Sequence, residues 1–287
     1  MCDNETFEEW KQYMTGRGKV TRRKFGALSA GAGLVAALPP VANAQAITES
    51  EVEIETPDGT ADCFFAHPAS GQHAAVLVWP DIMGLRSAFR DMGRRLAQSG
   101  YSVLTVNPFY RDAAAPVVPE GTSFGDPAAQ TVFQYAGNLN RDTHVTDARA
   151  FVDWLDQQSS VDTRRQIGTT GYCMGGPMVM HTAWARADRI GAGATFHGGG
   201  LAGGPHELIP EMDANFLIAI ADNDDARAPD DKTILRDAFD AAGLEAEIEV
   251  YAGADHGWCP PDMPAYHEEQ AERAWSRLLA LFDRSLA

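Results

Sequence analysis

The sequence predicts an α/β fold in which a mostly parallel, twisted β-sheet carries helices on both faces. Short, continuous apolar runs alternate along the chain with segments whose apolar residues recur at helical spacing. This alternation favours parallel strands joined by right-handed helical crossovers. The chain has 287 residues, of which 45% are hydrophobic and 22% are charged, so it can form one sizeable core. We therefore expect a single globular domain over residues 45–287.

The first expected element is a hairpin, because the β-rich residues 51–55 and 63–67 flank the turn signal Pro57-Asp58-Gly59. The apolar runs that follow are continuous, as in strands that are buried on both faces. The expected strands are 74–79, 101–106, 166–172, 193–196, 216–221 and 246–251, and the expected helices are 89–98, 144–158, 176–187, 231–242 and 266–286. A Gly- and Pro-rich loop at 107–130 is long enough to line a site at the carboxyl ends of these strands.

Charge and cysteine usage argue against several classes of protein. The formal net charge is -17, and such an acidic chain repels nucleic acid and anionic membranes, so we expect neither as a partner. The cysteines are widely spaced and form no Cys-x-x-Cys pair and no Cys/His cluster, which predicts neither a zinc site nor a disulfide framework. They are Cys2, Cys63, Cys173 and Cys259. We expect no metal and no organic cofactor.

Residues 1–44 have the pattern of a twin-arginine export signal. Arg22 and Arg23 precede a charge-free, weakly apolar stretch that closes with an Ala-x-Ala site at 42–44. The expectation is recognition by the twin-arginine export machinery, cleavage after Ala44 and a periplasmic location. Several glycines and the Pro39-Pro40 pair make the stretch a poor membrane-spanning helix, so no stable membrane insertion is expected. A disordered cytoplasmic leader and an uncleaved anchor are the alternatives.

A candidate nucleophile lies where a predicted strand ends and a helix begins. Residues 171–176 read Gly-Tyr-Cys-Met-Gly-Gly, which fits the pattern Gly-x-nucleophile-x-Gly with Cys173 in the central position. Glycines on either side let the chains approach a tight turn, and the N-terminus of the following helix favours a thiolate. The alternative interpretation is that Cys173 is a small buried hydrophobe in a glycine-rich turn.

Two further segments supply the partners that a nucleophile needs. Asp255-His256-Gly257-Trp258 follows the last predicted strand, and the acidic run 222–225 follows an earlier one. The chain order nucleophile, acid, histidine is that of a hydrolase triad in which a carboxylate orients the imidazole. Taken alone, the acidic run could equally be a surface turn. Three such features in this order, each at a strand end, favour the triad.

With these residues in view, the chain resembles the dienelactone hydrolase (carboxymethylenebutenolidase) family from about Glu51 to the C-terminus. The resemblance implies an α/β-hydrolase fold and a Cys-His-Asp triad with Cys173 as nucleophile and His256 as base. Counting three residues from Ala221 gives Asp224 as the acid, and counting four back from Pro229 gives Asp225; we choose Asp224. The strings that carry the resemblance are 79–85, 107–111, 171–176 and 255–258.

The resemblance also assigns supporting roles. The backbone N–H groups of Ile82 and Met174 would form the oxyanion hole. Asp81 stands where the family has an acidic residue that interacts with the resting thiol, and Arg111 matches an arginine that receives the carboxylate of dienelactone. Tyr172, beside the nucleophile, belongs with these two residues as a substrate-binding or thiol-activating group. The family's second arginine for the carboxylate would fall near Pro260 and is missing, so weaker selectivity for acidic lactones is expected.

The expected function is hydrolysis of a dienelactone-like lactone or a carboxylic ester through an acyl-thioester. A broad-specificity esterase or thioesterase is the nearest alternative. A thiol-redox protein, with Cys259 as resolving thiol, and a non-catalytic binding protein on the same fold are more distant ones. The run His197-Gly198-Gly199-Gly200 has no assigned role beyond lining a pocket at a strand end.

Overall fold

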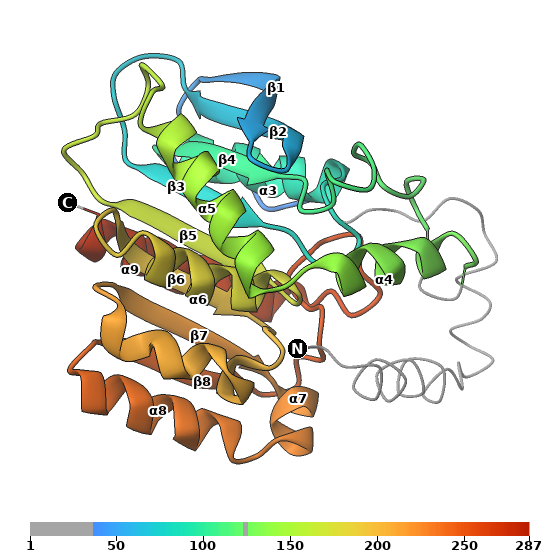
Figure 1. Cartoon of the computed structure of the whole chain (residues 1–287), viewed down its shortest axis with the longest axis vertical. Coiled ribbons are helices and arrows are strands. Elements are labelled where there is room, and N and C mark those ends of the chain that lie inside the picture. The colour runs from blue at the N-terminus through green and yellow to red at the C-terminus, as the bar shows by residue number, and fades with distance from the viewer. Residues whose placement is uncertain (1–36, 123–125, 287) are drawn as a thin grey trace.

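An eight-stranded sheet forms the centre of the computed structural model, which describes residues 37–122 and 126–286 (Figure 1). The strand order is β1-β2-β4-β3-β5-β6-β7-β8. The pairs β1–β2 and β2–β4 are antiparallel, and every other pair is parallel. The mostly parallel α/β sheet that the sequence predicts is therefore confirmed.

Every predicted strand is present, and most bounds agree to within a few residues. The opening hairpin is longer than predicted, and it closes with Thr56 paired to Gly59, so the turn falls where Pro57 and Asp58 indicate. The strands are β1 Ile47–Thr56, β2 Gly59–Pro68, β3 Ala75–Trp79, β4 Ser102–Val106, β5 Ile167–Tyr172, β6 Ile190–Phe196, β7 Asn215–Ala221 and β8 Ala246–Tyr251.

The predicted helices are also present, and the described residues form two more. The additional α4 lies just beyond the long loop, and α7 occupies the acidic run, where three aspartates in its first turn favour the positive end of the helix dipole. The helices are α3 Ser87–Gln98, α4 Ala129–Asn138, α5 Arg141–Leu155, α6 Gly175–Ala185, α7 Asp222–Arg227, α8 Asp231–Ala242 and α9 Glu268–Ser285. Short 3-10 segments follow β6 at Leu201–Gly203 and Pro205–Glu211.

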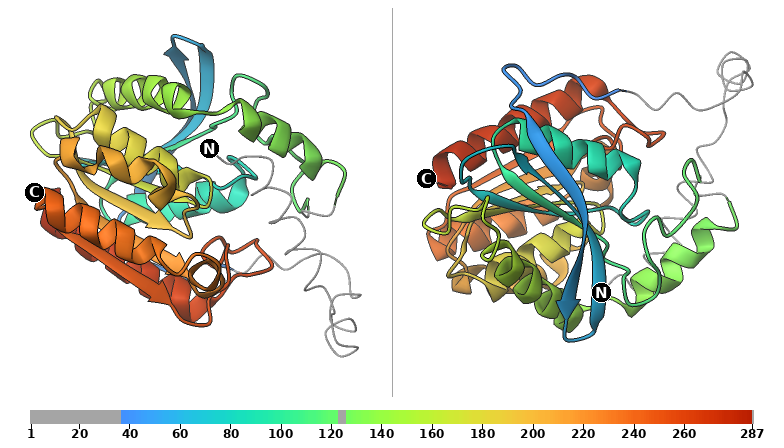
Figure 2. Two further views of the ribbon diagram at one scale, coloured as in Figure 1. Left: turned by 60° about the horizontal axis from the view of Figure 1, so that its bottom comes forward. Right: turned by 90° about the horizontal axis from the view of Figure 1, so that it is seen from above.

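Helices cover both faces of the sheet. Figure 1 shows α5, α6 and α8 in front of it, and Figure 2 shows α3 and α9 on the opposite side. Two apolar clusters correspond to these layers: Phe151 and Phe239 belong to the first, and Phe89 and Phe282 to the second. Because β3 is buried along its whole length, both layers pack on it. The sheet therefore holds the carboxyl ends of its parallel strands rigidly at one edge, where the site is built.

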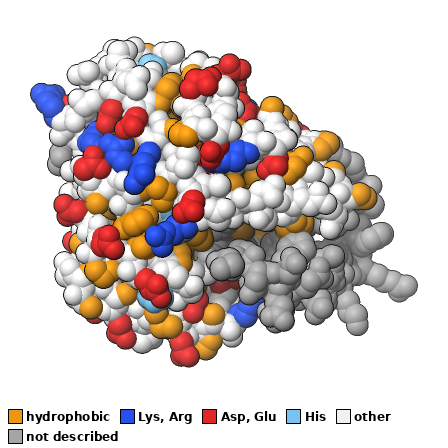
Figure 3. Space-filling model, viewed as in Figure 1, with side chains coloured by type: hydrophobic (Ala, Val, Ile, Leu, Met, Phe, Trp, Pro, Cys, Tyr) orange, Lys and Arg blue, Asp and Glu red, His pale blue; other side chains and the backbone are white. Residues whose placement is uncertain are grey.

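The segment before β1 lies against the second layer. Leu38 packs on that apolar cluster, and the backbone N–H of Gln45 donates to the carbonyl of Gln98 at the end of α3 (3.0 Å). The paired arginines of the predicted export signal lie outside the described residues. Within the described part of the chain, no helix is long and apolar enough to cross a membrane. On the face seen in Figure 3, acidic and basic side chains are interspersed.

Candidate active site

Cys173 lies in a strained turn between β5 and α6. Its φ is +54°, a left-handed conformation that is uncommon for a residue other than glycine. The turn is fixed by hydrogen bonds on either side, from the Cys173 N–H to the carbonyl of Phe196 (3.0 Å) and from the Gly176 N–H to the carbonyl of Cys173 (3.0 Å). The side chain is half-buried, whereas Cys63 and Cys259 are buried. Strain of this kind is concentrated at functional sites.

The glycines of this turn are required by close packing. A Cβ on Gly171 would lie 2.2 Å from the carbonyl oxygen of Gly175, and one on Gly175 would lie 2.5 Å from that of Trp79. A Cβ on Gly176 would lie 2.6 Å from the Cα of Gly198. The turn is therefore pressed against the end of β3 and against the glycine run that follows β6. This contact gives Gly198 a structural reason.

His256 follows β8, and Asp224 of α7 holds its ring. The Asp224 Oδ2 lies 2.6 Å from the His256 Nδ1. The backbone N–H of His256 donates to the Asn223 Oδ1 (2.9 Å), so two neighbouring residues of α7 bind the same histidine. The carboxylate of Asp225 instead accepts a hydrogen bond from Lys232 at 2.5 Å. Of the two candidate acids, the structure brings Asp224 to the imidazole.

The electrostatic environment of His256 favours its cation. Burial alone would lower its pKa, but the charges of Cys173 and Asp224, together with the hydrogen bond to Asp224, hold this pKa well above the usual value. Only 10% of the His256 side chain is exposed, so these interactions are weakly screened. The thiol and the carboxylate therefore both act on one imidazole. An imidazolium between two acidic groups is suited to support a thiolate.

Two backbone N–H groups are the candidates for an oxyanion hole: that of Ile82 in the loop after β3, and that of Met174, which directly follows Cys173. Within the described residues, neither the Ile82 N–H nor the Met174 N–H donates a hydrogen bond to another protein group. Met174 directly precedes α6, so its N–H adds to the positive end of that helix. Ile82 follows the end of β3, which packs on Gly175. These are the positions that the sequence predicts for an oxyanion hole.

Asp81 lies beside the predicted oxyanion loop, and its carboxylate is already bonded. Arg86 donates to both of its oxygens (2.7 and 3.0 Å), and the Met83 N–H donates to one of them (2.9 Å). Asp81 is 2% exposed and Arg86 is 5% exposed. The ion pair with Arg86 thus already engages both oxygens of the carboxylate that the family resemblance assigns to the resting thiol.

Arg111 is also bonded to carboxylates of the protein. Its guanidinium makes two hydrogen bonds to Asp147 of α5 (2.6 and 2.9 Å) and two to Asp58 in the hairpin turn (2.6 and 3.1 Å). Asp147 also accepts a hydrogen bond from the Tyr110 hydroxyl (2.7 Å). This network attaches the hairpin to α5. To bind a substrate carboxylate through two hydrogen bonds, Arg111 would have to exchange one of these partners.

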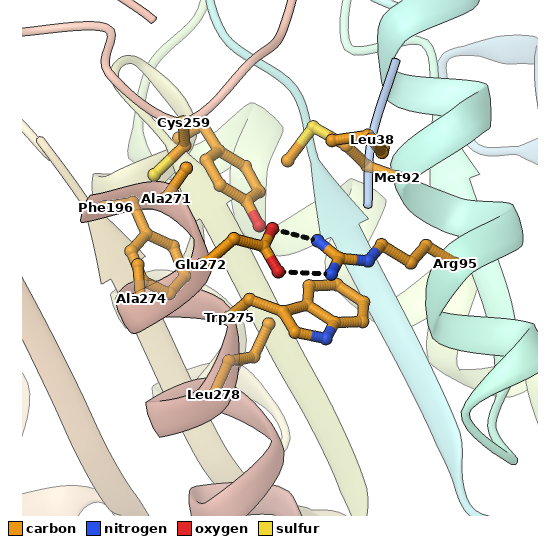
Figure 4. A pocket seen from close by; sticks show the side chains of 11 residues that line it. Leu38, Met92, Arg95, Phe196, Cys259, Ala271, Glu272, Ala274, Trp275 and Leu278 are labelled. Atoms are coloured by element: carbon orange, nitrogen blue, oxygen red, sulfur yellow. Dashed lines mark hydrogen bonds and ion pairs between the residues drawn. The ribbon is translucent and has the colours of Figure 1, made fainter. Parts of the chain in front are cut away.

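Tyr172 lies beneath the candidate site. It is 3% exposed, stacks on Phe196 and lines a cavity of about 20 Å³, together with Cys259. In Figure 4 the Arg95–Glu272 pair and Trp275 form the wall of this cavity. The space is enough for about one water molecule. The structure thus places Tyr172 in a packing position, in a cavity too small for a lactone.

His197, directly after β6, lies beside His256, and the sequence pattern assigns it no chemistry. Its ring centroid lies 4.9 Å from that of His256 and 5.0 Å from that of Trp258. It is 1% exposed, and within the described chain neither ring nitrogen has a hydrogen-bond partner. Burial, and then the charge of His256, hold its pKa well below the usual value. A neutral imidazole therefore packs against His256. The sequence signal that indicates a site residue here is the position of His197 directly after a predicted strand.

No group of three or more metal-ligating side chains is found among the residues that the structure describes. The candidate site brings together a thiol, an imidazole, a carboxylate and two backbone N–H groups. These are the parts of an acyl-transfer site.

Comparison with known proteins places this geometry in a family. Residues 61–286 match the dienelactone hydrolase family. A protein of Methylorubrum extorquens, provisionally named a carboxymethylenebutenolidase, is 27% identical over 277 residues, which cover 90% of this chain and 91% of the relative. A protein of Escherichia coli K12 with the same provisional name is 26% identical over 254 residues, covering 83% and 87%.

Solved structures agree with this match. A provisionally named dienelactone hydrolase of Klebsiella pneumoniae superposes with a TM-score of 0.73 at 26% identity, covering 84% of this chain and all of the other. The promiscuous phosphotriesterase P91 from metagenomic libraries, described as dienelactone hydrolase-like, gives 0.69 at 22% identity with coverage of 84% and 100%, which supports the fold alone. Since the family match spans most of its length, the chain belongs to the dienelactone hydrolase family and has the α/β-hydrolase fold.

Proposed function

We propose that this hydrolase cleaves carboxylic esters and lactones with Cys173 as nucleophile, His256 as general base and Asp224 as the carboxylate that orients the base. One observation carries the proposal: the strained Cys173 turn interacts with a histidine whose Nδ1 lies 2.6 Å from Asp224. Nucleophile, base and orienting acid in this arrangement form the general triad geometry.

The first half-reaction forms an acyl-thioester. The sulfur of Cys173 attacks the substrate carbonyl carbon, and the carbonyl electron pair moves to oxygen. The N–H groups of Ile82 and Met174 would bind this oxyanion; loss of one such donor typically lowers kcat by about 10²- to 10³-fold. His256 gives its proton to the leaving oxygen as the carbon–oxygen bond breaks. In a lactone, the released alcohol or enol stays attached to the acyl group.

The second half-reaction releases the acid. His256, now neutral, removes a proton from water, whose oxygen attacks the thioester carbonyl. The carbon–sulfur bond breaks, and Cys173 returns as a thiolate beside the imidazolium. General-base assistance of this kind contributes about 10²- to 10⁴-fold in rate. Asp224 keeps the Nδ1 of His256 protonated through both steps.

Substrate charge is expected to matter little. Arg111 is bonded to Asp147 and Asp58, and proline occupies position 260. A carboxylate-bearing dienelactone would therefore find no unengaged guanidinium at either family position. These observations favour neutral lactones and simple esters as substrates alongside dienelactone.

The redox alternative is weakened by the environment of its second thiol. Burial raises the pKa of Cys259 well above the usual value, so this residue is a neutral thiol at physiological pH. A resolving cysteine must react as a thiolate.

Export through a twin-arginine signal, with cleavage after Ala44 and a periplasmic location, remains part of the proposal on the sequence pattern alone.

The test is steady-state hydrolysis of dienelactone and p-nitrophenyl acetate by the full-length chain and by Cys173→Ala. We expect both activities to fall at least 10³-fold in the variant, because it lacks the sulfur that the proposed acyl intermediate needs. Cys63→Ala is the matched control: it removes a buried thiol of β2 and is expected to keep activity within threefold of wild type. Unchanged hydrolysis by Cys173→Ala would reject the nucleophile.

A further inference from the structure

Arg86 joins two loops that flank the candidate site. It directly precedes α3, is 5% exposed, and donates to both carboxylate oxygens of Asp81 (2.7 and 3.0 Å). On its other side it donates to both oxygens of Asp262 (2.5 and 2.9 Å). A further bond reaches the Gly84 carbonyl at 3.2 Å. The guanidinium is therefore held in one position by two bidentate ion pairs, a strong and directional arrangement.

The two carboxylates come from distant parts of the chain. Asp81 directly precedes Ile82 in the loop after β3, and Asp262 lies six residues beyond His256 in the loop after β8. In the sheet, β5, β6 and β7 separate these strands. The loops can meet only across the edge where the strands end. Arg86 is the side chain that connects them there.

The connection resists partial disruption. The side chains of Arg86 and Asp81 are only 6% and 3% exposed, so each would be left as a buried, unpaired charge without the other. Asp262 is 20% exposed, and its loss would remove one arm of the network at lower cost. Removing one partner of a buried ion pair is strongly destabilising. The network therefore favours the one arrangement of the two loops in which Arg86 is paired with both carboxylates.

We propose that Arg86 is a positioning residue: by clamping Asp81 to Asp262 it holds the Ile82 N–H in place for the oxyanion, relative to His256. The inference rests on the proposed function and assigns Asp81 a different role from the one that the family resemblance implies. In this role Asp81 anchors the oxyanion loop and does not activate the thiol. The reactivity of the Cys173 thiol then depends on His256 and Asp224, whereas acylation depends also on the clamp.

Two reactions of the same sulfur separate these roles. Alkylation of Cys173 by iodoacetamide needs a thiolate but develops no oxyanion. Acylation by p-nitrophenyl acetate needs both. A residue that positions the oxyanion loop therefore changes acylation alone, whereas a residue that forms the thiolate changes both reactions.

The experiment measures both rates on the full-length chain for wild type, Asp81→Asn, Arg86→Gln and Asp262→Asn, with the melting temperature of each. We expect acylation to slow at least tenfold in all three variants, up to the 10²- to 10³-fold that loss of an oxyanion donor costs. Alkylation is expected to stay within threefold of wild type. The control is Arg90→Gln. Arg90 lies in α3, four residues after Arg86, and its substitution removes an ion pair with the exposed Glu51 of β1. We expect neither rate to change.

Other outcomes overturn the inference in distinguishable ways. Parallel loss of alkylation and acylation in Asp81→Asn would make Asp81 a thiol activator, and unchanged acylation in Asp262→Asn would show that the clamp positions nothing. If Arg86→Gln does not fold, Asp262→Asn, whose carboxylate is nearer the surface, decides between these results. Absence of acylation at Cys173 in wild type would reject the proposed function itself, and the clamp with it.

Discussion

His256 and the pair His144 and His181 are all largely buried, but the charged groups around them differ. For His256, the charges of Cys173 and Asp224 and the hydrogen bond to Asp224 overcome the effect of burial and raise its pKa. His144 of α5 and His181 of α6 face each other, with their Nδ1 atoms 2.8 Å apart. Burial first, and then the charges of His181 and Arg111, lower the pKa of His144 to about 3, and burial and Arg141 lower that of His181 to about 4.

The difference shows that neighbouring charge, more than depth, decides what a buried imidazole does. The His144–His181 pair is neutral at physiological pH, with one Nδ1 donating a proton to the other, and it packs α5 against α6. Both environments touch the same helix, since α6 begins two residues after Cys173 and carries His181. A carboxylate makes the one histidine a base, and its absence leaves the other pair structural.

If the Asp224 carboxylate makes His256 a base, removing it should have a large effect on activity. In Asp224→Asn, His256 loses the acceptor that fixes its tautomer and stabilises its cation. We expect kcat for p-nitrophenyl acetate to fall by about 10⁴-fold, as for the equivalent change in a serine triad. The basic limb that His256 contributes to the pH–rate profile should move to lower pH.

The matched control for this change is Asp225→Asn. It lies one residue along α7, and its carboxylate binds Lys232. Activity within threefold of wild type is expected. Equal losses in the two variants would mean that α7 as a whole, and not the Asp224 carboxylate, supports His256.

The neutral pair predicts a smaller effect, on acid stability. The pKa values of His144 and His181 lie below the free value of 6.5, so the unfolded chain binds protons that the folded chain does not. Their contribution to the free energy of unfolding is complete above about pH 6.5 and is lost as the pH falls toward about 4 for His181 and about 3 for His144. We expect the free energy of unfolding to drop across this window by on the order of a few kcal/mol.

The double variant His144→Gln/His181→Gln sharpens this point. Glutamine keeps polar groups between α5 and α6 but does not titrate, so the slope of unfolding free energy against pH should flatten between about pH 6.5 and 4. Urea unfolding at several pH values measures it. His73→Gln, which changes a ring bonded to Ser70 in a surface loop, is the control. An unaltered slope in the double variant would show that the pair does not cause the acid sensitivity.

Sequence predicts the sheet well because its signal is local. Continuous apolar runs such as 74–79 and the turn residues of the hairpin act over a few positions, and the structure follows them. The glycines around Cys173 likewise report a close approach of neighbouring chains. The order of the three candidate residues along the chain then places them at one edge of the sheet.

The finer parts of the site depend on contacts that no local pattern encodes. Asp224 and Asp225 are adjacent, and only the direction in which α7 turns them decides which one reaches His256. Arg86 and Asp262 are 176 positions apart and are joined only by the fold. Arg111 matches a family motif, yet Asp58 and Asp147 occupy it. Those partners become visible only in three dimensions.

Trapping the acyl-enzyme tests directly whether Cys173 forms a thioester. The full-length chain would be mixed with p-nitrophenyl acetate, quenched in acid within the first turnover and digested, and its peptides analysed by mass spectrometry. We predict one acetyl group on the peptide that contains Cys173, absent from Cys173→Ala and lost again when quenching is delayed until the ester is exhausted. Hydrolysis with no acetyl group at Cys173, or with the acetyl group on another residue, would contradict it.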